Sequence, residues 1–460
     1  MRSIPLLLLV LALAPLLRGQ EAEVWIRGAA PAEVFFAGSR PVARIGRLLE
    51  IGAGDGAAAR RIALPPDACA WDLAPVPGDA TLALAWIEPR GLFARRLGGP
   101  DEAAVRLDEA GDLFRGRPDG GPVRLALLAA AGEGGLALLA PDRAGIRVRP
   151  LAGLGARPAR PFDVPAPATS RQSLGWGLGY RMETELRVPS HRLVRRGDED
   201  LLLVRRARDW RLVGADGKER PFGPAPRREE HKILDFDVAV PPIAADLDRD
   251  GRPDLLGFDP GRGLVLWYRG AKRGEGDEAP EPDQVLRVDG WILRAWVGDF
   301  DGDGRDDLAL LQVPQLGLLE QVAVIKSGEL PVRFDVRLLT AEGGFDETAR
   351  HPLRADLPIS LSLTRSGRRI LPRLPVLPAV APGRKPGLVF PDDEGRAVWW
   401  GLDGEGAWTS RRVLFEGRSD EIVAFSDAAA LRPRAEGWDL LLARVVEGGA
   451  GRVERLRLDD

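Results

Sequence analysis

Two acidic segments of the same form decide the fold of this chain. They are Asp246-Leu-Asp248-Arg-Asp250-Gly251-Arg-Pro-Asp254-Leu-Leu and Asp299-Phe-Asp301-Gly-Asp303-Gly304-Arg-Asp-Asp307-Leu-Ala. Their first aspartates, at 246 and 299, lie 53 residues apart. Each segment runs into a short apolar stretch, 255–258 or 308–311, which we interpret as a β-strand. Two copies in the same frame indicate an internal repeat.

The same frame recurs in weaker form along most of the chain. Taken as one position, the aligned residues are Thr81, Arg124, Asp200, Asp254, Asp307, Gly387 and Asp439. Repeats of about 50 residues, each a few short strands, are typical of a β-propeller, in which small sheets pack around a ring. We predict seven blades, with six or eight as alternatives. An N-terminal strand at 23–26 or 33–36 would close the ring against the last unit, 438–458.

The composition agrees with an all-β fold in one domain. The 460 residues are 45% hydrophobic and include 55 Gly and 39 Pro, so the chain is rich in turns and has enough apolar sequence for a large core. Proline-rich stretches such as 158–167 and 372–382 are predicted to be loops between strands. We therefore expect one propeller domain over 21–460, with the best repeats at about 240–325.

The alternating aspartates are an arrangement of calcium ligands. Ca²⁺ takes 6–8 hard oxygen ligands, and short carboxylates on a tight loop can converge on one ion. Gly251 and Gly304 would allow the sharp turn, and the carbonyls of Arg252 and Arg305 would each add a backbone oxygen. The loops are not EF-hands, since Gly257 and Leu310 occupy the twelfth position, where an EF-hand has a bidentate Glu. We predict two calcium ions that are structural, because four carboxylates leave little room for a catalytic water.

This loop, repeated at this spacing and followed by a strand, resembles the FG-GAP/VCBS repeat family. The resemblance is specific over about 240–325 and weaker elsewhere. It implies a β-propeller, seven-bladed in integrin α heads and of varied blade number in bacterial secreted proteins. By this resemblance the calcium ligands are Asp246, Asp248, Asp250, Asp254, Asp299, Asp301, Asp303 and Asp307.

The N-terminus predicts export from the cytoplasm. Met1 and Arg2 give a basic start, and the stretch from Leu6 to Leu17 is apolar before Arg18 ends it. This is typical of a secretory signal peptide, which we place at 1–20. The alternative, an N-terminal anchor or buried helix, is disfavoured because a membrane span needs about 20 apolar residues. We therefore expect a secreted or periplasmic protein with no transmembrane segment in its mature form.

Charge and cysteine content exclude several other classes. The formal net charge is −3 and the arginines are scattered, so we expect no nucleic-acid partner. The single Cys69 allows no disulfide within the chain. No Gly-x-Ser-x-Gly motif is present, and the glycines at 175–179 are interpreted as a turn because no helical pattern follows them.

The predicted function is that of a non-catalytic binding or adhesion module for an extracellular protein or glycan. We expect it to act as a monomer. Trp267, Tyr268, Trp399 and Trp400 stand at equivalent hairpin positions, where an exposed aromatic platform would suit such a partner; packing between blades is the alternative. The competing class is an enzyme acting on polysaccharide or lipid. A carboxylate cluster in the channel, away from the calcium loops, would favour the enzyme.

Overall fold

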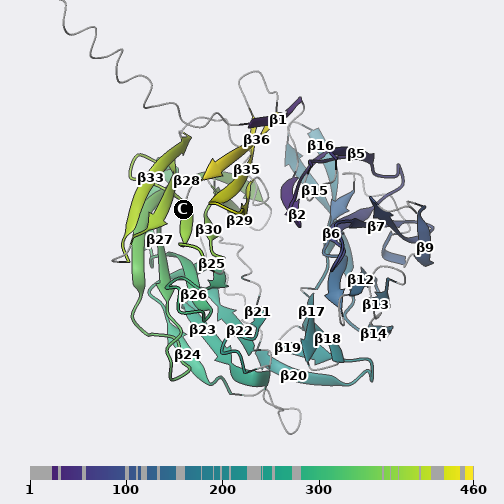
Figure 1. Cartoon of the computed structure of the whole chain (residues 1–460), viewed down its shortest axis with the longest axis horizontal. Helices are drawn as coiled ribbons and strands as arrows, with labels where there is room; N and C mark the ends of the chain where they lie inside the picture. Colours follow the sequence, from purple (N-terminus) through teal and green to yellow (C-terminus); the bar gives the residue numbers. More distant parts are fainter. Residues whose placement is uncertain are drawn as a thin grey trace, which may run out of the picture.

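The chain folds into a ring of small antiparallel sheets in the computed structural model (Figure 1). The structure describes residues 23–28, 33–53, 58–98, 103–109, 112–114, 122–131, 135–151, 161–177, 179–189, 191–196, 199–206, 209–224, 240, 242–250, 254–271, 281–364, 367–372, 375–381, 383–403, 406–415, 429–445 and 451–458. Eight sheets of four or five strands form the blades, and a ninth sheet of two strands lies between the third and fourth blades in the chain.

The first four blades follow one another along the chain. Blade 1 consists of β2 (Glu33–Ala37), β3 (Arg40–Ile45), β4 (Leu48–Ile51) and β5 (Arg60–Ala63). Blade 2 consists of β6 (Ala70–Pro75), β7 (Leu82–Glu88), β8 (Gly91–Leu97) and β9 (Val105–Asp108), with β10 (Val123–Arg124) parallel to β6. Blade 3 consists of β11 (Leu128–Ala131), β12 (Gly135–Pro141), β13 (Ile146–Pro150) and β14 (Phe162–Val164). The hairpin of β15 (Thr169–Gly177) and β16 (Gly179–Arg187) precedes blade 4, which consists of β17 (His191–Arg196), β18 (Glu199–Arg205), β19 (Asp209–Val213) and β20 (Glu219–Pro224).

The last four blades contain the two acidic segments and the closure of the ring. Blade 5 consists of β21 (Ile243–Ala245), β22 (Asp254–Asp259), β23 (Leu264–Tyr268) and β24 (Gln284–Arg287). Blade 6 consists of β25 (Trp291–Gly298), β26 (Asp307–Val313), β27 (Glu329–Arg337), β28 (Arg350–Thr364) and β29 (Gly367–Pro372). Blade 7 consists of β30 (Leu377–Ala379), β31 (Gly387–Pro391), β32 (Ala397–Leu402) and β33 (Trp408–Phe415). Blade 8 consists of β34 (Ala429–Pro433), β35 (Trp438–Val445), β36 (Gly451–Leu458) and β1 (Glu23–Gly28).

Helical structure is confined to short connections within the described residues. The α-helix α2 (Leu318–Ser327) joins β26 to β27, and short 3₁₀ turns are η2 (Asp112–Phe114), η3 (Pro260–Arg262) and η4 (Arg269–Ala271). The second strands of several blades, such as β7, β12 and β26, are buried at every position. They are near-continuous apolar runs because a neighbouring sheet covers each of their faces.

Shared hydrophobic cores join each blade to the next around the ring. Residues of blades 1 and 2 form one buried cluster, and further clusters join blades 2 and 3, 3 and 4, 4 and 5, 5 and 6, and 6 to 8. Val34 and Ala43 of blade 1 pack with Leu441, Ala443 and Val453 of blade 8. The eight sheets therefore form a closed propeller.

The N-terminal strand completes blade 8. β1 pairs antiparallel with β36, with Glu23 opposite Arg455 and Gly28 opposite Gly451. The predicted closure by an N-terminal strand is confirmed at 23–26, whereas the alternative stretch, 33–36, belongs to the first strand of blade 1. Tying the two ends of the chain into one sheet leaves no open edge between first and last blade.

The propeller has eight blades, so the first choice of seven was wrong and the alternative of eight is correct. The repeat assigned at Arg124 is not a blade, since β10 only adds two residues to the sheet of blade 2. Its apolar residues line the connection to blade 3, where Leu127 is fully buried and its N–H donates to Asp72 Oδ2 at 3.0 Å. Blades 1 and 3 were not recognised at their second strands, β3 and β12, which begin with Arg40 and Gly135.

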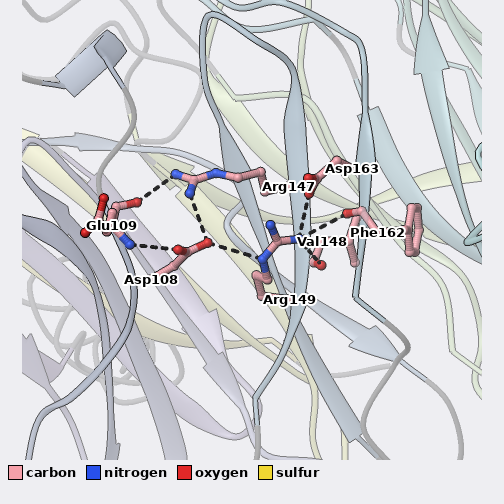
Figure 2. Close-up of polar contacts among 7 residues, drawn as sticks. All are labelled: Asp108, Glu109, Arg147, Val148, Arg149, Phe162 and Asp163. Atoms are coloured by element: carbon pink, nitrogen blue, oxygen red, sulfur yellow. Dashed lines mark hydrogen bonds and ion pairs between the residues drawn. The ribbon is translucent and has the colours of Figure 1, made fainter.

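Polar contacts reinforce the outer parts of neighbouring blades. Figure 2 shows Asp108, at the end of β9 in blade 2, between two arginines of β13 in blade 3. Asp108 Oδ2 accepts from Arg147 Nη1 at 2.9 Å and from Arg149 Nε at 3.2 Å. Arg149 Nη1 also donates to Asp163 Oδ1 at 2.6 Å. Hydrogen bonds to Asp163 and Asp108 outweigh burial and raise the pKa of Arg149, so it stays charged.

Candidate metal centres

The two acidic segments are equivalent loops in adjacent blades. One joins β21 to β22 in blade 5, and the other joins β25 to β26 in blade 6. In both blades the last aspartate of the segment is the first residue of the second strand: Asp254 is paired with Ala245, and Asp307 with Gly298. The internal repeat predicted from the sequence is therefore repeated in the strand register.

These last aspartates are fully buried and accept backbone hydrogen bonds on both oxygens. Asp254 Oδ2 accepts from Leu247 N at 3.0 Å, and its Oδ1 accepts from Gly270 N at 2.7 Å. Asp307 Oδ2 accepts from Phe300 N at 2.8 Å, and its Oδ1 accepts from Leu339 N at 2.8 Å. Each carboxylate thus joins its own acidic loop to the turn that follows the third strand of the blade.

Burial makes these carboxylates hard to ionise without a cation. Desolvation raises the pKa of Asp254 to about 6 and the pKa of Asp307 to about 7, although the backbone donors act in the opposite direction. Neighbouring carboxylates add to the effect, from Asp248 at the first loop and from Asp301 and Asp303 at the second. Negative charge is therefore concentrated around two buried oxygen pairs.

In blade 5, three of the predicted ligands converge. One carboxylate oxygen from each of Asp246, Asp248 and Asp254 lies within 4.8 Å of the others. Asp248 Oδ1 accepts from Asp250 N at 3.2 Å, which folds the loop back on itself. Arg249 has a φ of 60°, a left-handed conformation that is unusual for a residue with a Cβ. We call this group the blade-5 cluster.

In blade 6, the corresponding three aspartates converge in the same way. One oxygen from each of Asp299, Asp301 and Asp307 lies within 4.8 Å of the others, and we call this group the blade-6 cluster. The two oxygens of Asp299 accept from Gly302 N at 2.6 Å and from Gly304 N at 2.9 Å. Both glycines have a positive φ, 81° and 87°, which glycine adopts without steric cost.

The remaining predicted ligands lie beside the clusters. Asp250 and Asp303 are exposed and are not among the converging residues. Asp303 Oδ1 accepts from Arg305 N at 2.8 Å, and its other oxygen is paired with the Arg305 guanidinium. Gly251 and Arg252 lie outside the described residues. The roles of Asp250, Asp303 and the carbonyls of Arg252 and Arg305 as ligands stay predictions, as does the turn at Gly251.

The donor chemistry of both clusters suits a hard divalent cation. Every converging atom is a carboxylate oxygen, which is what Ca²⁺ and Mg²⁺ prefer. Two oxygens that share one Ca²⁺ at about 2.4 Å lie no more than about 4.8 Å apart, and both clusters meet this limit. The two clusters could therefore each hold a metal ion.

The two acidic loops also approach each other. The guanidinium of Arg249, from the blade-5 loop, lies beside Gly304 of the blade-6 loop. Asp306 interacts electrostatically with Arg249 and with Asp246 and Asp299, one from each cluster. The sequence analysis assigned no role to Arg249 or Asp306, because only the packing of the two blades brings them together.

The match to known families falls on this part of the chain. Residues 246–310 match the FG-GAP-like repeat, and both clusters lie within the matched segment. The FG-GAP-like match confirms the resemblance inferred from the two aspartate patterns, and its span agrees with the best repeats predicted at about 240–325.

Two solved structures show a weak likeness to most of this chain. A crystal structure of a protein from Lactobacillus plantarum matches 85% of this chain and 98% of its own, with 10% identity and a TM-score of 0.33. The V. cholerae biofilm matrix protein Bap1 matches 85% of this chain and 67% of its own, with 11% identity and a TM-score of 0.27. No curated protein matches the chain. At such low identity and TM-score, neither structural likeness bears on function.

The structure buries most of the proposed aromatic platform. Trp267, Tyr268 and Trp399 are 0%, 3% and 3% exposed, and Trp400, which is half-buried, donates through Nε1 to Phe390 O at 3.1 Å. Trp267 also packs against Phe345 of blade 6 at a ring-centroid distance of 5.0 Å. Packing between blades therefore accounts for these positions, and three of the four side chains are not accessible to a partner.

The segment that bears on export lies outside the described residues. Met1, Arg2, Leu6 and Leu17 all belong to that segment, so the signal peptide stays a prediction. Over the part of the chain that is described, no helix is both long enough and apolar enough to cross a lipid bilayer.

In blade 8 the residue equivalent to Asp254 and Asp307 has different partners. Asp439 aligns with Asp254 and Asp307 in the repeat and is likewise 0% exposed. Its Oδ2 accepts from Arg432 Nη2 at 2.8 Å and from Arg455 Nη2 at 2.7 Å. These guanidiniums outweigh burial and lower the pKa of Asp439, so this carboxylate is neutralised within the chain itself.

Proposed function

We propose that this chain is an extracytoplasmic calcium-binding β-propeller that acts as a binding or adhesion module for a protein or glycan, and not as an enzyme. The observation that carries the calcium assignment is the pair of matching clusters, three carboxylates each, in equivalent loops of adjacent blades. Calcium fits better than magnesium because loops of clustered carboxylates are all-protein cages, whereas Mg²⁺ keeps several waters.

The position of the clusters supports a structural role for the ions. Each cluster includes a buried aspartate that links its loop to a second turn of the same blade, through Gly270 in blade 5 and Leu339 in blade 6. An ion held there would fix both turns and neutralise a buried charge. Calcium would then stabilise the folded ring by mass action, by about 2.7 kcal/mol per site at 100 times Kd.

The binding role is supported by the architecture of the ring and by the N-terminal sequence. The N-terminal apolar stretch supports export to a compartment where calcium is abundant. A rigid ring with loops at its face suits recognition of a large partner, since binding residues are commonly carried on loops held by a rigid scaffold.

Calorimetric calcium titration of the mature chain tests the metal assignment. We expect two ions per chain, one in Asp248→Asn, one in Asp301→Asn and none in the double variant. Asp392→Asn is the matched control, because Asp392 also accepts loop N–H groups and pairs with an arginine, in the turn between β31 and β32. Fewer than one ion per chain, or undiminished binding by the double variant, would overturn the assignment.

A second experiment tests the binding role. The calcium-loaded chain is screened on arrays of glycans and of secreted proteins, in parallel with assays for polysaccharide and lipid hydrolysis. We expect retention of at least one partner and no turnover. Turnover of a substrate, or retention of nothing by a chain that is folded and calcium-loaded, would refute this part of the proposal and leave the metal assignment standing.

A further inference from the structure

The positively charged side chain of Arg269 lies beside the blade-5 cluster. It is the first residue after β23, and its backbone N–H donates to Asp283 Oδ2 at 2.9 Å. The next N–H, that of Gly270, donates to the buried Asp254. These two bonds fix the turn, so the guanidinium of Arg269 reaches back across the acidic loop.

The guanidinium of Arg269 forms an ion pair with Asp248, one of the converging residues of the cluster. Asp248 Oδ2 accepts from Nη2 at 2.7 Å and from Nε at 3.1 Å. The guanidinium also lies over the Trp267 ring, 5.2 Å from its centroid, and beside Gly343 of blade 6. The Asp248 side chain is 11% exposed and that of Arg269 is 39% exposed, so solvent screens this ion pair in part.

Blade 6 has no counterpart of this arginine at the equivalent position. Leu255 pairs with Tyr268 in blade 5 and Leu308 pairs with Arg337 in blade 6, so Arg269 corresponds to Leu338. The residues that follow, Gly270 and Leu339, make the same hydrogen bond to the buried aspartate. The two clusters therefore match in backbone and carboxylates but differ in this charge.

Other arginines near the blade-6 loop have partners outside the cluster. Arg305 pairs with Asp303, which is not among the converging residues. Arg249 approaches from blade 5 and interacts with Asp306, which is not among the converging residues. Arg269, in contrast, donates directly to a converging aspartate of the blade-5 cluster.

We propose that Arg269 sets the two metal sites at different affinities, so that the blade-6 site fills first and the blade-5 site fills at higher calcium. This inference rests on the proposed calcium function. An ion at the blade-5 cluster has to share Asp248 with the guanidinium, and a positive charge a few ångströms away weakens cation binding. Arg269 is a positioning residue that holds Asp248 in place when no ion is bound. The expected difference in Kd due to its charge is about tenfold.

Single-site variants allow each affinity to be measured alone. Asp301→Asn leaves the blade-5 site and Asp248→Asn leaves the blade-6 site, so calcium calorimetry of each gives one Kd. We expect a weaker Kd for the blade-5 site. Adding Arg269→Gln to Asp301→Asn should tighten that Kd about tenfold, whereas adding it to Asp248→Asn should change nothing. Arg269→Lys keeps the charge and should tighten binding less than Arg269→Gln does.

Arg287→Gln is the matched control, because Arg287 is an exposed arginine on β24 of the same blade. A second readout separates the charge effect from a purely structural role. In EGTA, Arg269→Gln should lower the melting temperature, because Asp248 loses its counter-ion beside Asp254, and calcium should restore it. A purely structural role would lower the melting temperature equally with and without calcium.

The outcomes separate this inference from the proposed function. If the unaltered chain binds no calcium, the proposed function fails and the inference fails with it. If both sites bind but Arg269→Gln leaves the blade-5 Kd within threefold of its parent or weakens it, only the inference is overturned. Equal Kd values at the two sites of the unaltered chain would overturn it as well.

Discussion

The substitution Asp307→Asn should destabilise the fold when calcium is present and stabilise it when calcium is removed. Asp307 is fully buried, and desolvation raises its pKa from 3.8 to about 7. At pH 8 without calcium, keeping this carboxylate ionised in the folded state costs about 4 kcal/mol. Asparagine removes that cost and can still accept one of the two N–H bonds, from Phe300 or Leu339. Losing the other bond costs about 1.5–3 kcal/mol, so the variant should be about 1–2.5 kcal/mol more stable in EGTA.

In calcium the unaltered chain should instead be more stable than the Asp307→Asn variant. The ion neutralises the carboxylate of Asp307 in the unaltered chain, and the variant loses the blade-6 site and its stabilisation of about 2.7 kcal/mol at 100 times Kd. The pH dependence gives a second check. Because the folded pKa lies above the unfolded one, this group favours the folded state most below about pH 4, and that contribution is lost as the pH rises through about 7. In EGTA the unaltered chain should gain stability from pH 8 to pH 6 relative to the variant.

Urea denaturation followed by tryptophan fluorescence measures both effects, at pH 8 and pH 6, in EGTA and in calcium. Asp303→Asn serves as the control, because Asp303 is exposed and paired with Arg305, and its unfolding free energy in EGTA should change by less than about 0.5 kcal/mol. A variant Asp307→Asn that is less stable than the unaltered chain in EGTA at pH 8 would refute the reasoning, as would the same order of stability in both conditions.

Three further results are expected. Calcium should bind more weakly at pH 6 than at pH 8, because burial raises the pKa values of Asp254 and Asp307 to about 6 and about 7 and protons compete with the ion; calorimetry at both pH values checks this. Asp439→Asn should cost about 3–5 kcal/mol equally in calcium and in EGTA, because its partners are arginines; urea denaturation in both conditions tests it. A chain that starts at residue 29 lacks β1 and leaves β36 unpaired, so it should unfold at lower urea and self-associate on size-exclusion chromatography, and an unchanged monomer would contradict the closure of blade 8.

The repeat and the fold class could be predicted because they leave a local trace in the sequence. Asp254 and Asp307 mark the first residue of a strand, and the apolar run behind each marks a strand buried on both faces. Blades 1 and 3, whose second strands begin at Arg40 and Gly135, were not recognised, and the unit placed at Arg124 is not a blade, so the count was seven instead of eight. Arg40 is 2% exposed and donates to the carbonyls of Gly52 and Ala58, a buried cation that no periodicity reveals.

The converging carboxylates were predicted, but their surroundings were not. The spacing of Asp246, Asp248 and Asp254 within one loop is a local pattern, and the structure brings their oxygens together. Arg269 lies 21 residues beyond Asp248 and reaches it only because two strands and a turn intervene. Side chains that meet through strand pairing or blade packing leave no motif in a single sequence.

Blades 5, 6 and 8 neutralise an equivalent buried aspartate in different ways. A buried aspartate at the start of the second strand has to be neutralised in blades 5, 6 and 8 alike. In blade 8, Arg432 and Arg455 supply the positive charge from the same sheet, and this is the blade that joins the two ends of the chain. In blades 5 and 6 the aspartates face acidic loops, which add negative charge and create a need for a cation. If the two clusters hold calcium as proposed, closure of the ring is independent of the ion, whereas the sector formed by blades 5 and 6 depends on it. Arg269 then lessens that dependence in blade 5.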